Sequence, residues 1–191
     1  MTAVPVMHER MTARQFLALP EREDSRRLEL VDGEIVVSEP TMLNNVVQVT
    51  FVFALRTWIE SGKERGRVCV PLDVGLDDRN VFVPDVSWYS STGAPDVHAP
   101  RPYPVPDLAI EIRSPSTWVY DIGAKRAGYE RRGLPELWLV DTAAEQVLVF
   151  RRSSADRPRF DVALELDFGE TLRSPLLPGF ALALDQLFRA A

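Results

Sequence analysis

Two strand-like apolar segments of the chain each contain a single carboxylate. Asp85 follows the apolar residues 81–84, and Glu111 lies inside the apolar residues 108–112. A carboxylate within such a run must be paired, hydrogen-bonded or bound to a metal, because this offsets its desolvation. The two segments therefore predict buried strands that carry acidic side chains into the interior, and any fold of this chain has to satisfy them.

Lys125 lies on the helix expected after the second acidic segment. Asp121, Lys125 and Tyr129 are four residues apart, so they share one helix face. Two converging carboxylates and a lysine can support Mg²⁺-assisted phosphodiester hydrolysis: the acids hold the metal, the metal activates water, and the lysine orients the nucleophile or neutralises charge. The plainer alternatives are a strand-end acid at Asp85 and an exposed pair of Asp121 with Lys125, worth about 0.3–0.5 kcal/mol.

The rest of the pattern predicts a mixed α/β fold. The expected helices are a short one capped by Thr12, a long buried one up to residue 60 that Asn44 or Asn45 caps, one at 119–132 and one at 182–189. The expected strands are 28–31 and 34–38 around an Asp-Gly turn, 67–76, 81–88, 107–113, 137–140, 146–151 and 160–166. The proline-rich segment 91–106 is expected to be a surface loop and a candidate lid.

Strand alternation places further polar residues near the acidic pair. Glu111 and Arg113 are two residues apart on one strand, so they are expected to face the same space. Glu29 points away from the face of Leu28 and Leu30, either as an additional acid of the site or as part of a solvated strand face. Tyr129 is expected either to pack with its hydroxyl at the surface or to be an accessory residue of the site.

Length and composition indicate one domain. The chain has 191 residues, of which 46% are hydrophobic, so we expect a flexible N-terminus at 1–11 and a single domain at 12–191. The formal charge of −6 opposes tight binding to a polyanion, so a nucleic-acid substrate requires a local basic surface. The candidates for that surface are Arg126, Arg131, Arg132, Arg151 and Arg152.

Several classes of protein fit poorly. Cys69, expected to be a buried structural thiol, is the only cysteine, and His8 and His98 are the only histidines, so disulfide scaffolds and histidine or cysteine clusters for zinc are excluded. No run approaches the roughly 20 apolar residues of a membrane span, and the first 14 residues lack a signal-peptide pattern. We therefore expect a cytoplasmic protein.

The order of several motifs resembles the Uma2 family of restriction-endonuclease-like proteins, in the PD-(D/E)XK nuclease superfamily. The resemblance extends from roughly Arg27 to Asp141. Its parts are residues 27–35 (RLELVDGEI), Pro84-Asp85, residues 111–116 (EIRSPS), Asp121, Lys125, Tyr129, Gly133, residues 136–138 (ELW) and Asp141. The resemblance implies a mixed, twisted sheet flanked by helices. It also implies that Asp85 and Glu111 bind the metal and that Lys125 is the catalytic lysine, moved from the strand to the following helix, with Glu29 as an additional acid.

Two positions depart from the family pattern. The superfamily lysine two residues after the strand acid is Arg113 here, and a histidine frequent after the first hairpin is Asn44. An arginine can clamp phosphate but cannot act as a base. The leading hypothesis, which rests on the resemblance, is a Mg²⁺-dependent DNA endonuclease that also accepts Mn²⁺. The alternative is a nuclease-fold binding or regulatory protein without catalysis. A homodimer is expected only by analogy with the superfamily, because duplex cleavage often uses two sites.

Overall fold

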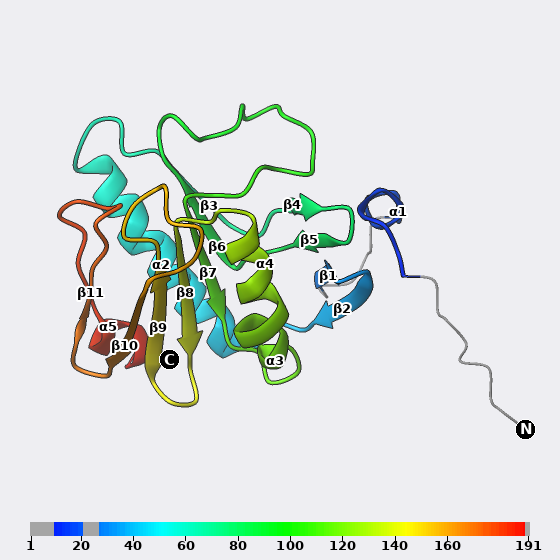
Figure 1. The fold of residues 1–191 in the computed structure, drawn as a ribbon. Helices are drawn as coiled ribbons and strands as arrows, with labels where there is room; N and C mark the ends of the chain where they lie inside the picture. Colours follow the sequence, from blue (N-terminus) through cyan, green and yellow to red (C-terminus); the bar gives the residue numbers. More distant parts are fainter. Residues whose placement is uncertain (1–9, 21–26, 190–191) are drawn as a thin grey trace, which may run out of the picture.

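The computed structural model describes residues 10–20 and 27–189 (Figure 1). Most of the expected flexible N-terminus, 1–11, therefore lies outside the described residues. Within them the chain forms a mixed α/β domain built around a central sheet.

The central sheet has six strands in the order β10-β9-β8-β7-β6-β3. Strands β7 and β8 are parallel, and every other neighbouring pair in this sheet is antiparallel. The strands are β3 (Arg67–Cys69), β6 (Val86–Tyr89), β7 (Leu108–Ile112), β8 (Glu136–Asp141), β9 (Gln146–Arg151) and β10 (Val162–Asp167). The parallel pair requires a crossover, and the segment between β7 and β8 supplies it with a helix.

A smaller sheet has the order β2-β1-β5-β4. Its strands are β1 (Arg27–Val31), β2 (Glu34–Ser38), β4 (Val74–Asp77) and β5 (Asn80–Phe82). Asp32 and Gly33 both have positive φ, at 48° and 81°, so the predicted two-residue hairpin is confirmed. A third pair, β11 (Thr171–Leu172) and β12 (Leu182–Ala183), lies near the C-terminus.

Helices cover both faces of the central sheet (Figure 1). The helices of the described residues are α1 (Ala13–Leu17), which packs on the smaller sheet, and α2 (Met42–Glu60), α3 (Trp118–Tyr120), the π-helical turn η1 (Asp121–Lys125), α4 (Arg126–Arg131) and α5 (Leu184–Phe188). Along β7, Leu108 and Ile110 pack in the core with α2, whereas Ala109 packs with α4 and the smaller sheet. Glu111 has the same strand parity as Ala109, so it faces α4, as the alternation predicts.

The predicted bounds of two long strands, 67–76 and 81–88, are wrong. Each is divided into two short strands, and the two parts belong to different sheets. Pro71 and Pro84 lie at the interruptions, where the missing N–H group ends a ladder and the chain passes between the sheets. Asp85 follows one of these breaks.

Three local predictions also need correction. The residue that caps α2 is Thr41, and Asn44 is its capping-box partner three residues later. The helix predicted at 119–132 contains the π-helical turn η1, which is a form enriched at functional sites. Cys69 is half-buried rather than buried.

Gly128 sets how closely α4 approaches the smaller sheet. A Cβ atom at this position would lie 2.8 Å from two ring atoms of Phe82 on β5. The ring of Tyr129 packs edge-on against the same phenylalanine, with centroids 5.1 Å apart. The small residue therefore allows the helix that carries Lys125 to contact the sheet that carries Glu29.

We predict that Gly128→Ala destabilises the protein by about 1–3 kcal/mol, because the added methyl group overpacks this contact. Gly123→Ala is the matched control, since a Cβ there meets nothing within 4 Å and should leave stability unchanged or slightly raised. Urea unfolding of the two variants measures the difference. Equal stability of both would show that α4 can shift away from β5 without cost.

Candidate active site

Asp85, Glu111 and Lys125 line one small cavity at the end of β7. The cavity has a volume of about 20 Å³, enough for a water molecule or an ion but not for a nucleotide. Its other lining residues are Arg27, Glu29, Ser38, Pro40, Asn44, Val83, Ile112, Thr117 and Asp121. None comes from the 91–106 loop, so that candidate lid does not border the cavity.

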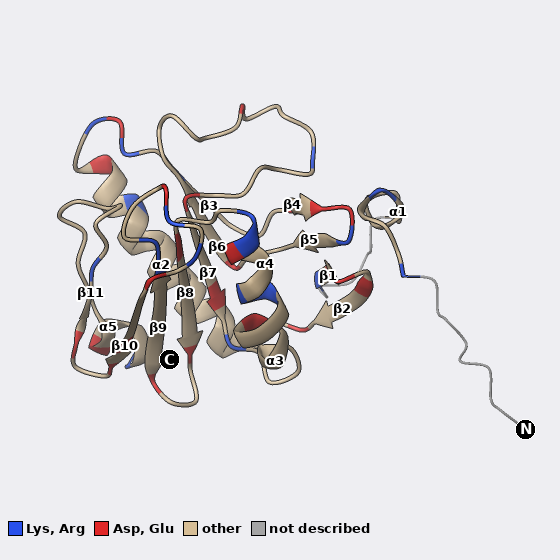
Figure 2. Cartoon of the chain, in the orientation of Figure 1, with Lys and Arg blue, Asp and Glu red and all other residues tan. Residues whose placement is uncertain are grey.

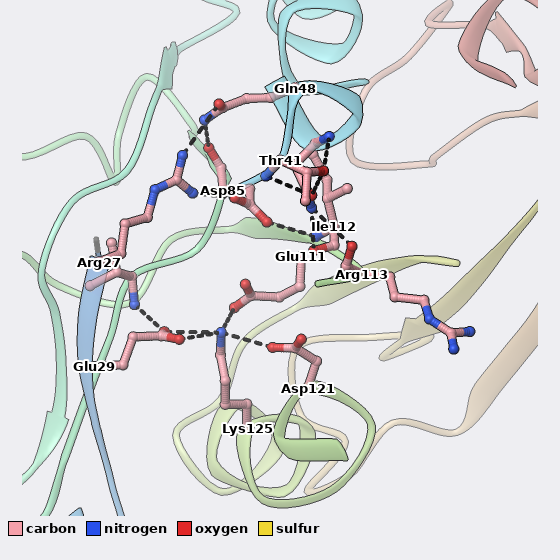
Figure 3. Close-up of polar contacts among 12 residues, drawn as sticks. Arg27, Glu29, Thr41, Gln48, Asp85, Glu111, Ile112, Arg113, Asp121 and Lys125 are labelled. Atoms are coloured by element: carbon pink, nitrogen blue, oxygen red, sulfur yellow. Dashed lines mark hydrogen bonds and ion pairs between the residues drawn. The ribbon is translucent and has the colours of Figure 1, made fainter. Parts of the chain in front are cut away.

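Lys125 lies at the centre of three carboxylates (Figure 3). Its Nζ is 2.8 Å from Glu111 Oε1, 2.9 Å from Glu29 Oε1 and 3.0 Å from Asp121 Oδ1. The lysine side chain is only 3% exposed. The solvent-exposed pair with Asp121 is therefore the wrong description of this lysine, because the ammonium group joins β7, β1 and η1 in the interior.

Asp85 lies directly before β6, beside the strand that carries Glu111. Val86 pairs with Ile110 across the two strands. The Ile112 N–H donates to Asp85 Oδ2 at 2.7 Å, and Arg27 forms an ion pair with Asp85 Oδ1. The acid thus comes from a neighbouring strand end, with both oxygens satisfied inside the protein.

Glu29 and Tyr129 are both buried parts of the cluster. The Tyr129 hydroxyl donates to Glu111 Oε1 at 2.7 Å, so the expected surface hydroxyl is wrong. Glu29 accepts a hydrogen bond from the Val83 N–H at 2.6 Å and contacts Lys125. Of the two alternatives for Glu29, an additional acid of the site or part of a solvated strand face, the structure therefore shows a buried acid within the cluster.

Arg113 does not share the space of Glu111. Its Nη1 lies 2.7 and 2.8 Å from the two carboxylate oxygens of Asp141, and its guanidinium lies over the Trp118 ring. Figure 3 shows the side chain turned away from the cluster. The prediction fails because β7 ends at Ile112 and Asp141, at the end of β8, offers a bidentate partner.

Three polar residues were given no site role from the sequence; Asn44 and Arg27 line the cavity, and Gln48 contacts Asp85 beside it. Asn44 Nδ2 donates to the carbonyl oxygens of Ile112 at 3.3 Å and Arg113 at 2.9 Å, which fastens the start of α2 to the end of β7. Gln48, one helical turn later, donates to the Asp85 carbonyl at 2.7 Å. Arg27 has the same strand parity as Glu29, and this signal could have placed it at the site.

Burial and charge shift the pKa values of the cluster. Desolvation raises the pKa of Asp85, although Arg27 opposes the shift, and it raises the pKa of Glu111 well above its usual value against the effect of Lys125. Desolvation likewise raises the pKa of Asp121 to about 6. Burial would lower the pKa of Lys125, but the surrounding carboxylates outweigh it and raise that pKa well above normal.

The charged groups that line the cavity fit a divalent cation. They are four carboxylates and two cations, which leaves an excess of two negative charges when all are ionised. Mg²⁺ binds oxygen ligands and commonly uses one or two carboxylates plus water. Among residues 10–20 and 27–189, no three acidic, histidine or cysteine side chains are arranged as they stand to hold a metal. The carboxylate oxygens of Asp85 and Glu111 are nonetheless of the ligand type that Mg²⁺ prefers.

The family assignment agrees with this site. A family model described as "Uma2: Putative restriction endonuclease" matches residues 13–185. The chain belongs to the Uma2 family. That description supports a nuclease function that acts on nucleic acid, and the Uma2 match includes every residue that lines the cavity.

A solved structure shares the Uma2 chain's fold. It is the crystal structure of a putative nuclease belonging to DUF820 from Anabaena variabilis, with 21% sequence identity and a TM-score of 0.76. The alignment covers 94% of this chain and 98% of that one. The predicted restriction-endonuclease-like α/β fold is therefore confirmed. No curated protein matches the chain. Within the described residues, no helix is long and apolar enough to cross a membrane.

We predict that the metal-free protein becomes more stable as the pH falls from 7 towards 5. Asp121, with a folded pKa of about 6 against an ordinary 3.8, binds a proton more readily when folded, so its contribution is lost as the pH rises through 6. Asp85 and Glu111 shift in the same direction. Melting temperatures across this range should differ by several degrees.

Asp121→Asn tests the origin of that pH dependence. The variant should show a flatter stability profile, because it removes one of the titrating groups. Asp78→Asn, at an exposed turn between β4 and β5, is the control and should keep the wild-type slope. An unchanged slope in Asp121→Asn would place the pH dependence outside the cavity.

Proposed function

We propose that this protein is a Mg²⁺-dependent endonuclease that hydrolyses phosphodiester bonds of DNA, with Mn²⁺ as a substitute metal. One observation carries the proposal: Asp85 before β6, Glu111 on β7 and Lys125 on η1 line one cavity, in which four carboxylates, when ionised, exceed the two cations by two charges. In a member of the Uma2 family, that charge excess is best explained by a divalent cation.

Four charged residues of the cavity and the neighbouring Tyr129 have distinct roles in this proposal. Asp85 and Glu111 hold the metal, which when bound supplies an activated water and neutralises charge on the phosphate. Lys125 stays protonated at neutral pH because its pKa is raised, so it provides a fixed positive charge and not a general base. Tyr129 orients Glu111 through their hydrogen bond, and Glu29 holds the ammonium group beside it.

The substrate has to approach the cavity from outside. The cavity is too small for a nucleotide, so we propose that only the scissile phosphate reaches its rim. Figure 2 shows basic positions at the end of α4 and in the connection after β9. Arg152 is used internally there, donating to the carbonyl oxygens of Leu134 and Glu130 and lying over Phe160. The exposed Arg131 and Arg132 are better placed to contact DNA phosphates.

Two further parts of the proposal concern the assembly and its location. We propose a homodimer as the cleaving species, because each strand of a duplex requires its own cut. We also propose a cytoplasmic location, because a chain with one cysteine has no internal disulfide of the kind common in secreted domains.

A non-cleaving binding or regulatory protein is the second candidate. Arg113, at the position of the superfamily lysine, is paired with Asp141 outside the cavity, and this observation favours it. The two candidates differ in one measurable property, which is cleavage that depends on the acidic pair.

We predict that Asp85→Asn and Glu111→Gln each lower DNA cleavage at least about 100-fold, because each removes a charge that holds the metal. Nicking and linearisation of plasmid DNA in Mg²⁺ or Mn²⁺ measure the loss. Glu60→Gln, an exposed acid at the end of α2, is the matched control and should cleave at the wild-type rate. A wild-type protein that cleaves neither DNA nor RNA in any divalent metal would favour the binding candidate.

We predict that Lys125→Met abolishes DNA cleavage and that Lys125→Arg retains little of the wild-type cleavage rate. The planar guanidinium cannot occupy the compact position where one ammonium group contacts three carboxylates within 3.0 Å. Arg113→Met is the control, since this residue lies outside the cavity lining, and it should retain cleavage. Full cleavage by folded Lys125→Met would refute the catalytic role of the lysine while leaving the metal site intact.

A further inference from the structure

The two carboxylate oxygens of Asp85 have different partners: one accepts a main-chain hydrogen bond and the other pairs with an arginine. Oδ2 accepts the Ile112 N–H at 2.7 Å, which fixes the carboxylate against the end of β7. Oδ1 is paired with the guanidinium of Arg27. A divalent cation that binds Asp85 through Oδ1 therefore competes with Arg27 for that oxygen.

The two cations of the cavity differ in their freedom to move. Lys125 is enclosed by three carboxylates and is 3% exposed, whereas the Arg27 side chain is 21% exposed and begins β1 at the rim. Besides Asp85, the Arg27 guanidinium has only a weak contact with Gln48 Oε1, at 3.5 Å, within the described residues. Arg27 is thus the cation that can leave without dismantling the cluster.

Asp85 remains in position when Arg27 leaves. Its Oδ2 is still bound to the Ile112 N–H, and Gln48 Nε2 still donates to its main-chain carbonyl at 2.7 Å. The Ile112 contact does not involve Arg27, whereas Gln48 also contacts Arg27 through its Oε1. The Ile112 N–H therefore keeps the carboxylate oriented toward the cavity when Arg27 leaves.

We propose that Arg27 is a displaceable counter-ion: a divalent cation replaces it on Asp85, and the released guanidinium binds a phosphate of the substrate at the cavity rim. This inference rests on the proposed function. The guanidinium fork can bind two phosphate oxygens at once, and a bound divalent cation repels it from the carboxylates. Arg27 would therefore move from protein to substrate when the site is loaded.

Arg27→Gln separates this role from a structural one, because the two affinities should change in opposite directions. Isothermal calorimetry without nucleic acid should show about tenfold tighter Mg²⁺ binding than in the wild type, since a competing charge is removed. Fluorescence anisotropy with a short DNA duplex in Ca²⁺ should show weaker binding. Arg101→Gln is the matched control, because it breaks another arginine–aspartate pair, with Asp73, outside the cavity; both affinities should stay unchanged.

Weaker or unchanged Mg²⁺ binding by Arg27→Gln would overturn the inference, because Arg27 would then support the metal site instead of competing for it. If the wild-type protein binds neither Mg²⁺ nor Mn²⁺, both the inference and the proposed function fail. If the wild type binds metal but Arg27→Gln does not bind it more tightly, only the inference about Arg27 fails. If Arg27→Gln does not fold, Arg27→Lys replaces it: Mg²⁺ affinity should stay close to wild type while DNA affinity falls. DNA binding as tight as the wild type by Arg27→Lys would reject the phosphate contact.

Discussion

The buried ammonium group of Lys125 is the interaction on which the site depends. It brings together Glu29 from β1, Glu111 from β7 and Asp121 from the same helical segment, each within 3.0 Å. Three carboxylates this close would repel one another strongly without a cation, and an unpaired buried lysine would be equally unfavourable. The smaller sheet, the central sheet and the crossover helix are therefore joined by one charged centre, and Gly128 permits the close approach that this requires.

The same cluster gives the cavity its chemical character. Lys125 and Arg27 do not balance the four carboxylates, and the remaining negative charge is what a divalent cation would neutralise. The two cations of the cavity differ in burial: Lys125 is enclosed and pairs with three of the acids, whereas Arg27 lies at the rim and pairs with Asp85.

Local patterns predicted much of the fold correctly. The turn at Asp32-Gly33, the alternation along β7 and the end of α4 near Gly133 all depend on a few neighbouring residues, so short-range rules suffice. The spacing of Asp121, Lys125 and Tyr129 likewise predicted their common face. The errors occur where distant segments decide the outcome, as at Arg113, where Asp141 on another strand captures the side chain.

The sequence by itself determined that Asp85 and Glu111 are acids within apolar segments and that Lys125 follows on a helix, because burial and periodicity are properties of local sequence. Only the tertiary structure decided which partners satisfy them. The pairing of Arg27 with Asp85 joins residues 58 positions apart, and the contact of Lys125 with Glu29 joins residues 96 positions apart. Such pairs depend on how the two sheets and the crossover helix pack, which no local pattern specifies.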